Sequence, residues 1–275
     1  MRGVRLVVSY DGTEFCGWQR QPEQRSVQRE VEAAIEALTG EVTTVRGASR
    51  TDSGVHARGQ IAAFDTSRPL PTLGWVRGLN GKLPQDVAVR EAEFCTAGYD
   101  PRFDALRKNY RYVIHTGIER DPIDRHRAWH LGPRRAQPRP GGRGPILDVD
   151  AMRAAVPHFV GTHDFRAFRS SRDARDNTIR TIEEARVTCP WSGSDDLVAF
   201  EVRGNAFLQH MVRIMAGTLV EVGRKRIAPS TIPELLRSDA ERDDAGPTAP
   251  PHGLCLMSIQ LGRKRAARVG DSGSR

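Results

Sequence analysis

The segment that most constrains this chain runs from Arg46 to Phe64 and reads RGASRTDSGVHARGQIAAF. Gly47, Gly54 and Gly59 surround a single aspartate, Asp52, and an alternating apolar-polar stretch follows. Because glycine takes positive φ without steric cost, the pattern predicts a tight, irregular loop between two strands. Such loops often present catalytic side chains. The simpler interpretation is an Asx-type turn, in which the carboxylate bonds its own backbone.

These residues resemble a family signature. Arg50 to Ala57 reads RTDSGVHA and is followed by GQ, which is similar to the active-site motif of the TruA-type tRNA pseudouridine synthases. Ser53 stands where the family usually has Ala, a change between two small residues. Further matches occur in family order: SYDGTEFCGWQRQ (Ser9–Gln21), SVQ (Ser26–Gln28), KNYRY (Lys108–Tyr112), GTHDF (Gly161–Phe165), GNAFLQHMVRIMAG (Gly204–Gly217) and APPHGLCL (Ala249–Leu256). Each motif alone is weak, but together they are specific and cover roughly residues 4–261.

The resemblance implies the pseudouridine synthase fold, with two similar α+β halves whose joined, largely antiparallel sheets flank a central catalytic cleft. We expect an N-terminal half over residues 1–105, a C-terminal half over 106–262 and a basic disordered tail over 263–275. The resemblance also implies a function, the conversion of uridine to pseudouridine at positions 38 to 40 in the anticodon stem-loop of tRNA. It further implies a homodimer in which one tRNA spans both subunits.

The formal net charge of +8 suggests a polyanionic partner. Residues 132–147 contribute +4 and residues 262–275 contribute another +4, so these two segments account for the whole excess. A basic surface on the folded body must therefore come from clustering of charges. Pro, Gly and Arg dominate 132–147, which predicts an insertion or surface loop. Such charged segments also serve solubility alone.

The four cysteines are far apart and form no CxxC pair, which argues against a zinc site or a disulfide framework. No apolar run is long enough to span a bilayer, and the N-terminus lacks a signal-peptide pattern. We therefore expect a soluble, cytoplasmic protein without a membrane partner.

The pattern of apolar residues and turn signals predicts the order β-α-β-loop-β-α-β in the first half and a looser repeat of it in the second. In the first half, the predicted elements are strands at 4–10, 42–46, 60–65 and 86–95, a helix capped by Ser26 and ended by Gly40, and a short helix opened by Pro71. The second half is predicted to hold strands at 109–115, 178–189, 197–203 and 254–261, and helices from Asp150 to Phe159, Phe207 to Val222 and Thr231 to Leu236.

Isomerising uridine to pseudouridine breaks N1–C1′, turns the base and forms C5–C1′, with no redox change and no added group. The overall reaction demands no metal or organic cofactor, and we expect none. It needs an ionised carboxylate near C1′ or C2′, a hold on the detached uracil and a route for the C5 proton. Asp52 is the candidate carboxylate. It could attack C1′ to form an acylal or remove the 2′ hydrogen to give a glycal, and either role needs the same residue.

A carboxylate in a cleft stays ionised when a guanidinium lies beside it, and by the resemblance Arg213 supplies this ion pair. Arg213 lies next to an apolar helical stripe, and Gly217 one turn later leaves room for close approach. The stripe consists of Phe207, Met211, Ile214, Met215 and Leu219. The alternative is a snorkelling arginine that covers the edge of the core.

Three further residues are candidates for substrate binding. Tyr110 could stack on the flipped uracil and relay a proton near C5, although a strand tyrosine is more often core. Arg50 could fill the space that the uridine leaves or contact a phosphate. Leu254 would form an apolar floor under the base, or be ordinary strand core.

Other functions find less support in the sequence. His126 and His130 would suit a metal only if helical, and no third ligand is evident. There is no Walker loop, no GxGxxG and no nucleophile elbow. A glycosidic hydrolase is disfavoured because a second catalytic carboxylate is not evident. The remaining alternative is a non-catalytic tRNA-binding or folding factor, which would not need the Asp52, Tyr110 and Arg213 set.

Overall fold

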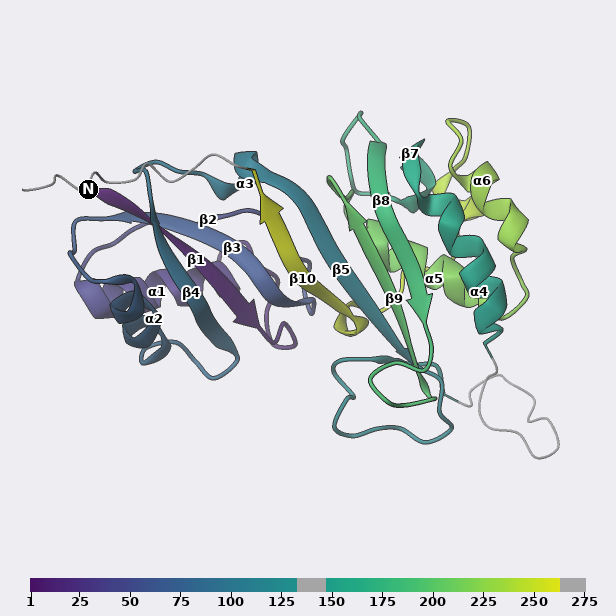
Figure 1. Cartoon of the computed structure of the whole chain (residues 1–275), viewed down its shortest axis with the longest axis horizontal. Helices are drawn as coiled ribbons and strands as arrows, with labels where there is room; N and C mark the ends of the chain where they lie inside the picture. The colour runs from purple at the N-terminus through teal and green to yellow at the C-terminus, as the bar shows by residue number, and fades with distance from the viewer. Residues whose placement is uncertain (133–146, 263–275) are drawn as a thin grey trace, which may run out of the picture. The chain divides into compact units, whose positions relative to one another are not determined.

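The computed structural model describes residues 1–132 and 147–262 (Figure 1). The predicted insertion and the predicted basic tail fall almost entirely outside these residues. The described chain forms two compact units. Unit 1 comprises Met1–Leu106 with residues 258–262, and unit 2 comprises Arg107–Met257.

Unit 1 is built on an antiparallel sheet in the order β4-β1-β3. Its elements are β1 (Arg2–Tyr10), α1 (Val27–Thr39), β2 (Arg46–Gly47), β3 (His56–Thr66), α2 (Thr72–Asn80), β4 (Val87–Cys95) and the short α3 (Pro101–Asp104). Burial alternates along β1, where Leu6 is buried between Ala62 of β3 and Ala92 of β4. This alternation is expected of a sheet with one covered face, and α1 and α2 cover it in Figure 1.

Helix α1 begins after Ser26, whose extended backbone marks the predicted N-cap although its side chain caps no amide. It ends at Gly40, which adopts the left-handed conformation and donates its amide to Glu36. The predicted strand over 42–46 is wrong except at its end. Of residues 42–46, only Arg46 pairs with β3, as part of β2. Val42 is 85% exposed, so this apolar side chain covers no sheet face.

The strands of unit 2 pair antiparallel in the order β5-β9-β8-β7, with β6 alongside β5 in parallel. Its elements are β5 (Ala105–His115), β6 (Trp129–His130), α4 (Val149–Ala155), β7 (Gly161–Asp164), β8 (Ile179–Thr188), β9 (Leu197–Gly204), α5 (Met211–Gly223), α6 (Ile232–Leu235) and β10 (Leu254–Leu261). The first two residues of β5 and the last four of β10 belong to unit 1. Short 3-10 turns lie at Val156–Phe159, Arg166–Phe168, Pro229–Thr231, Arg242–Asp244 and Pro251–Gly253.

Two helices in unit 2, α5 and α4, differ from the prediction at their boundaries. Helix α4 ends at Ala155, and a 3-10 turn continues to Phe159. Helix α5 begins at Met211, not Phe207, because His210 takes a left-handed backbone conformation that interrupts the helix. Helix α4 is capped by Asp148, whose carboxylate accepts from the Ala151 amide, and not by Asp150. Asp150 instead forms an exposed ion pair with Arg153.

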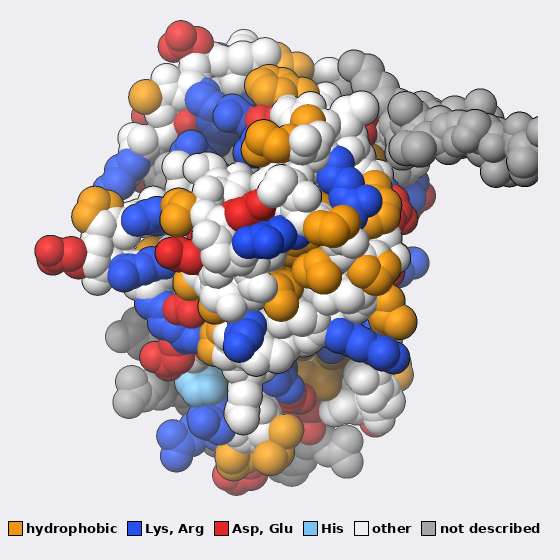
Figure 2. Space-filling view, turned by 90° about the vertical axis from the view of Figure 1, so that its left-hand side faces the viewer, with side chains coloured by type: hydrophobic (Ala, Val, Ile, Leu, Met, Phe, Trp, Pro, Cys, Tyr) orange, Lys and Arg blue, Asp and Glu red, His pale blue; other side chains and the backbone are white. Residues whose placement is uncertain are grey.

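The predicted α+β class with largely antiparallel strands is confirmed. Within the described ranges, no helix is both long and apolar enough to cross a membrane. On the face shown in Figure 2, Lys and Arg side chains are interspersed with Asp and Glu side chains. This mixture agrees with a body whose charges balance once the two basic segments are set aside.

Candidate active site

Asp52 lies half-buried in the loop between β2 and β3, which we call the Asp52 loop (residues 48–55). The amide of Val55 donates to the Asp52 carbonyl at 3.2 Å and closes the turn. Gly54 takes a φ of 75° at this turn, as the glycine pattern predicts. The backbone of this turn thus fixes the position from which the Asp52 side chain projects.

A second segment, which we call the N-terminal brace (residues 10–18), holds the Asp52 loop from one side. The Trp18 amide donates to the Thr51 carbonyl and the Gly54 amide donates to the Phe15 carbonyl, each at 3.2 Å. The Ser53 hydroxyl donates to the same Phe15 carbonyl at 3.2 Å. Most of these bonds join backbone groups, so the brace fixes the loop whichever side chains it carries.

The brace approaches so closely that one position requires glycine. Gly17 has a φ of +116°, and a Cβ there would lie 2.5 Å from the Thr51 carbonyl oxygen. The buried hydroxyls of Tyr10 and Thr51 are 2.7 Å apart and add a neutral hydrogen bond. The brace therefore reaches Thr51, the residue just before Asp52, through both backbone and side chain.

The base of the Asp52 loop is anchored on β3. The fully buried amide of Gln60 donates to the Ser49 carbonyl at 2.6 Å, and the Ala48 amide donates to the Ile61 carbonyl at 2.8 Å. Removing the partner of such a buried amide would leave a polar group without a hydrogen bond and would lower the free energy of unfolding. Arg50 lies on the same loop and is exposed.

In unit 2, Tyr110 is buried on β5, and its ring meets Phe207 edge to face, with centroids 5.1 Å apart and planes at 81°. Two residues on, Tyr112 donates its hydroxyl to the Pro250 carbonyl at 2.8 Å. Burial raises the pKa of Tyr112 far above its usual value, so this phenol stays protonated.

Arg213 projects from the first turn of α5, and its Nε donates to the Ala249 carbonyl at 2.8 Å. The Ala249 amide returns a bond to the Arg213 carbonyl at 3.1 Å. Gly217 permits this contact, since a Cβ there would overlap the Pro247 carbonyl oxygen. Leu254, buried at the start of β10, follows this segment.

The sequence reasoning missed the N-terminal brace as a structural partner of the Asp52 loop. In the sequence these residues stand out only as the family motif SYDGTEFCGWQ. The glycines at positions 12 and 17 are the pattern that indicates a close approach of this segment to another part of the backbone. The predicted pairing of Asp52 with Arg213 joins residues of different units and stays a prediction. Tyr110, Arg213 and Leu254 all lie in unit 2, while Asp52 and Arg50 share one loop of unit 1.

The HRAWH segment is a turn followed by β6, not a helix. His130 Nε2 lies 2.9 Å from the Gly117 carbonyl oxygen, and its ring centroid is 5.0 Å from that of His115. Among the residues that the structure describes, no cluster of three or more His, Cys, Asp or Glu side chains could hold a metal ion. In GTHDF, Asp164 accepts from Thr178 at 2.6 Å and pairs with Arg166, which anchors β7.

The fold and the loop define an α+β protein that presents one fixed carboxylate between two strands. The family model described as tRNA pseudouridine synthase matches residues 6–104 and 155–260. Similar proteins include the tRNA pseudouridine synthase A of Geobacter sulfurreducens, 42% identical over 261 residues (95% of this chain and 100% of that protein). The protein of the same name in Myxococcus xanthus is 44% identical over 260 residues, covering 94% of this chain and 92% of its own length. The chain belongs to the tRNA pseudouridine synthase family.

A crystal structure of a Cbf5-Nop10-Gar1 complex aligns over 79% of this chain and 54% of its own, with 12% identity and a TM-score of 0.31.

Proposed function

We propose that this protein converts uridine to pseudouridine within tRNA and that Asp52 is the essential carboxylate. Family membership supports the reaction, and the single observation that supports the residue is the immobilised Asp52 loop. Backbone bonds from the N-terminal brace and from β3 hold this loop on both sides. Groups held in place before the substrate arrives lose no orientation entropy during the reaction.

The proposed reaction is an isomerisation. The N1–C1′ bond breaks, the uracil turns and the C5–C1′ bond forms, while C5 loses its proton to solvent and N1 takes up a proton in exchange. We propose that Arg213 supports the ionised form of Asp52 and that Tyr110 stacks on the uracil. Arg50 would contact the backbone or the vacated space, and Leu254 would lie under the base. Asp52 would act through an acylal or a glycal, and the required residue is the same in both.

We further propose that the targets are positions 38 to 40 of the anticodon stem-loop, that a homodimer binds one tRNA across both subunits, and that the protein is cytoplasmic and uses no metal or cofactor. Extracting a stacked base costs a few kcal/mol and least in unpaired regions, which favours a target at the edge of a loop. The four free cysteines suit a reducing compartment.

The deciding experiment measures tritium release from tRNA labelled at uridine C5. We expect wild type to release tritium and Asp52→Asn to be slower by at least about 10³-fold, because the reaction loses its carboxylate. The matched control is Glu14→Gln, which removes one charge from an exposed residue of the N-terminal brace and should leave the rate unchanged.

Two results would contradict the proposal. Full turnover by Asp52→Asn would remove Asp52 from the reaction. No release by wild type, with tight tRNA binding by both proteins, would favour a non-catalytic tRNA-binding factor.

A further inference from the structure

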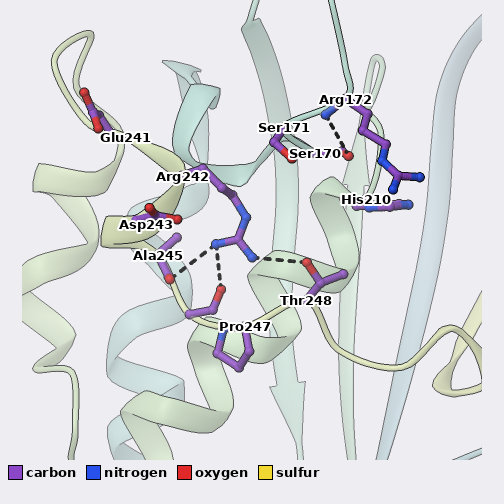
Figure 3. Close-up of a pocket in the computed structure, with 11 residues that line it drawn as sticks. Ser170, Ser171, Arg172, His210, Glu241, Arg242, Asp243, Ala245, Pro247 and Thr248 are labelled. Atoms are coloured by element: carbon purple, nitrogen blue, oxygen red, sulfur yellow. Dashed lines mark hydrogen bonds between the residues drawn. The ribbon is translucent and has the colours of Figure 1, made fainter.

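Unit 2 contains a cavity of about 640 Å³ that no residue of the proposed reaction lines (Figure 3). Its walls come from the loop after β7, from the residue before α5 and from the segment between α6 and β10. The lining residues used below are Ser170, Ser171, Arg172, His210, Arg242 and Thr248. We call this cavity the Arg172 pocket. A volume of this size matches a site for a nucleotide-sized group.

The segment that supplies Arg172 is rich in arginine. Residues 165–180 hold five arginines against two aspartates. Arg175 pairs with Asp173 of this segment, and Arg166 pairs with Asp164 just before it, so two of the five arginines are in ion pairs. The pKa of Arg180 is lowered, first by burial and then by the neighbouring cation Arg175, which reflects the crowding of positive charge here.

Two more arginines of this segment have their guanidinium groups occupied. Arg169 donates to the Arg175 carbonyl at 2.7 Å, and Arg180 donates to the Ile179 carbonyl at 2.6 Å. The side chain of Arg172 is exposed, and its guanidinium has no hydrogen-bond or ion-pair partner within residues 1–132 and 147–262. Arg172 is therefore a cation available to an external anion.

The wall that carries Arg172 is fixed before any ligand arrives. The Ser170 amide donates to the Gln209 carbonyl at 2.9 Å, and the Gln209 amide donates to the Asp173 carboxylate at 3.0 Å. The Arg172 amide donates to the buried Ser170 hydroxyl at 3.3 Å. These bonds connect the loop that carries Arg172 (residues 169–178), which we call the Arg172 loop, to the residue just before His210. Figure 3 shows the Arg172 and His210 side chains next to each other.

The opposite wall carries the acidic residues of the pocket and is equally fixed. Arg242 donates to the Gly246 carbonyl at 3.0 Å and to the Thr248 hydroxyl at 3.1 Å, so its guanidinium is already bonded within this wall. Glu241 and Asp243 lie on this side, away from Arg172 and His210 (Figure 3). An anion would therefore occupy the end of the pocket formed by Arg172, His210 and Ser171.

Helix α5 adds to the attraction of an anion at this end. Its N-cap residue is His210, no side chain caps its first amides, and its first turn contains no acid. The N-terminus of a helix of 13 residues carries a partial positive charge that favours phosphate groups.

We propose that the Arg172 pocket binds a backbone phosphate of the substrate tRNA, with Arg172 as its cation and with His210 and Ser171 as neighbouring donors. The proposal rests on the proposed function, because an RNA substrate is what brings a phosphodiester here. The chain links the pocket to Arg213, since Thr248 precedes Ala249, which exchanges two hydrogen bonds with Arg213. A phosphate held in this pocket would therefore help to position the strand relative to Arg213.

The test compares Arg172→Gln with wild type for tRNA affinity between 50 and 200 mM salt. Loss of one phosphate contact should weaken binding about five- to tenfold and make the slope of log K against log salt shallower by about 1. The rate at saturating tRNA should stay within about twofold. The matched control is Arg237→Gln, an exposed arginine paired with Asp239, which removes the same charge and should leave the slope unchanged.

A second measurement locates the contact on the RNA. Stem-loops carrying one neutral methylphosphonate at a time should reveal a position where neutralisation weakens binding to wild type but not to Arg172→Gln. Equal effects on both proteins at every position would overturn the proposal. So would an unchanged salt slope in Arg172→Gln.

Failure of this inference is distinguishable from failure of the proposed function. If wild type binds and turns over tRNA while Arg172→Gln matches it in every respect, only the inference fails. If wild type does not release tritium at all, the proposed function fails first. Titration with inorganic phosphate separates the two sources of the anion. Binding of free phosphate that depends on Arg172, without any change in the tRNA salt slope, would show a site for a small anion and overturn the proposal.

Discussion

The Asp52 loop of unit 1 and the Arg172 loop of unit 2 are both irregular segments, yet different chemistry holds each in place. Backbone amides, a buried Gln60 and a neutral hydroxyl pair hold the first. The ionised Asp173 holds the second through Arg175 and the Gln209 amide. A loop that presents a reactive carboxylate gains from neutral supports, because these leave its electrostatics to the substrate and its catalytic partner. A loop that attracts a polyanion gains from nearby arginines.

The comparison is tested most severely at Gly17. Gly17→Ala would place a Cβ against the Thr51 carbonyl at a φ that non-glycine residues rarely adopt. We expect a loss of about 2–4 kcal/mol in the free energy of unfolding. Turnover should fall by about 10²-fold, since displacement of a catalytic group by about 1 Å has an effect of that size. Chemical denaturation and tritium release measure the two effects.

The matched control for this variant is Gly98→Ala. Gly98 also has a positive φ, of 75°, but a Cβ there would meet no atom within 4 Å. Gly98→Ala should lower the free energy of unfolding by about 1 kcal/mol and leave turnover unchanged. If both variants lose activity equally, the contact between the brace and Thr51 is not what positions Asp52.

The Asp173 network should respond to pH. Hydrogen bonds from Arg175, opposed by burial, hold the pKa of Asp173 well below its usual range. A depressed carboxyl pKa stabilises the fold fully at pH values above the unfolded pKa of about 3.9, and the contribution is lost progressively as the pH falls from there through the folded pKa. Asp173→Asn should therefore lower the free energy of unfolding by about 2 kcal/mol at pH 7, and the difference from wild type should narrow steadily below about pH 4.

Urea unfolding of Asp173→Asn at pH 7, 5 and 3 measures this gap. The control is Asp176→Asn, an exposed aspartate of the same segment that changes the charge equally and should have little effect. A gap that persists unchanged at pH 3 would mean that ionisation of Asp173 is not what secures the Arg172 loop.

Local patterns in the sequence account for the elements but not for what supports the candidate site. Alternation and turn signals predict β1, β4 and β10 closely, and the family signature points to Asp52. The apolar run from Phe207 extends the predicted helix too far, since burial continues across the left-handed His210 while helical geometry does not. The bond from Trp18 to Thr51 joins residues more than thirty positions apart, and no local propensity encodes such a contact.

The smallest expected effect concerns the buried pair of Tyr10 and Thr51. Tyr10→Phe removes one hydroxyl from a hydrogen bond whose oxygens are 2.7 Å apart and keeps the ring that packs near Trp18. We expect a loss of about 1 kcal/mol in the free energy of unfolding and less than a tenfold loss of turnover, because the backbone bonds of the brace remain. Thr51→Val removes the other hydroxyl, and the double variant should cost less than the sum of the two single changes. Additive costs would show that the two hydroxyls do not support the loop together, and the contrast with the ion-paired Arg172 loop would then rest on backbone groups alone.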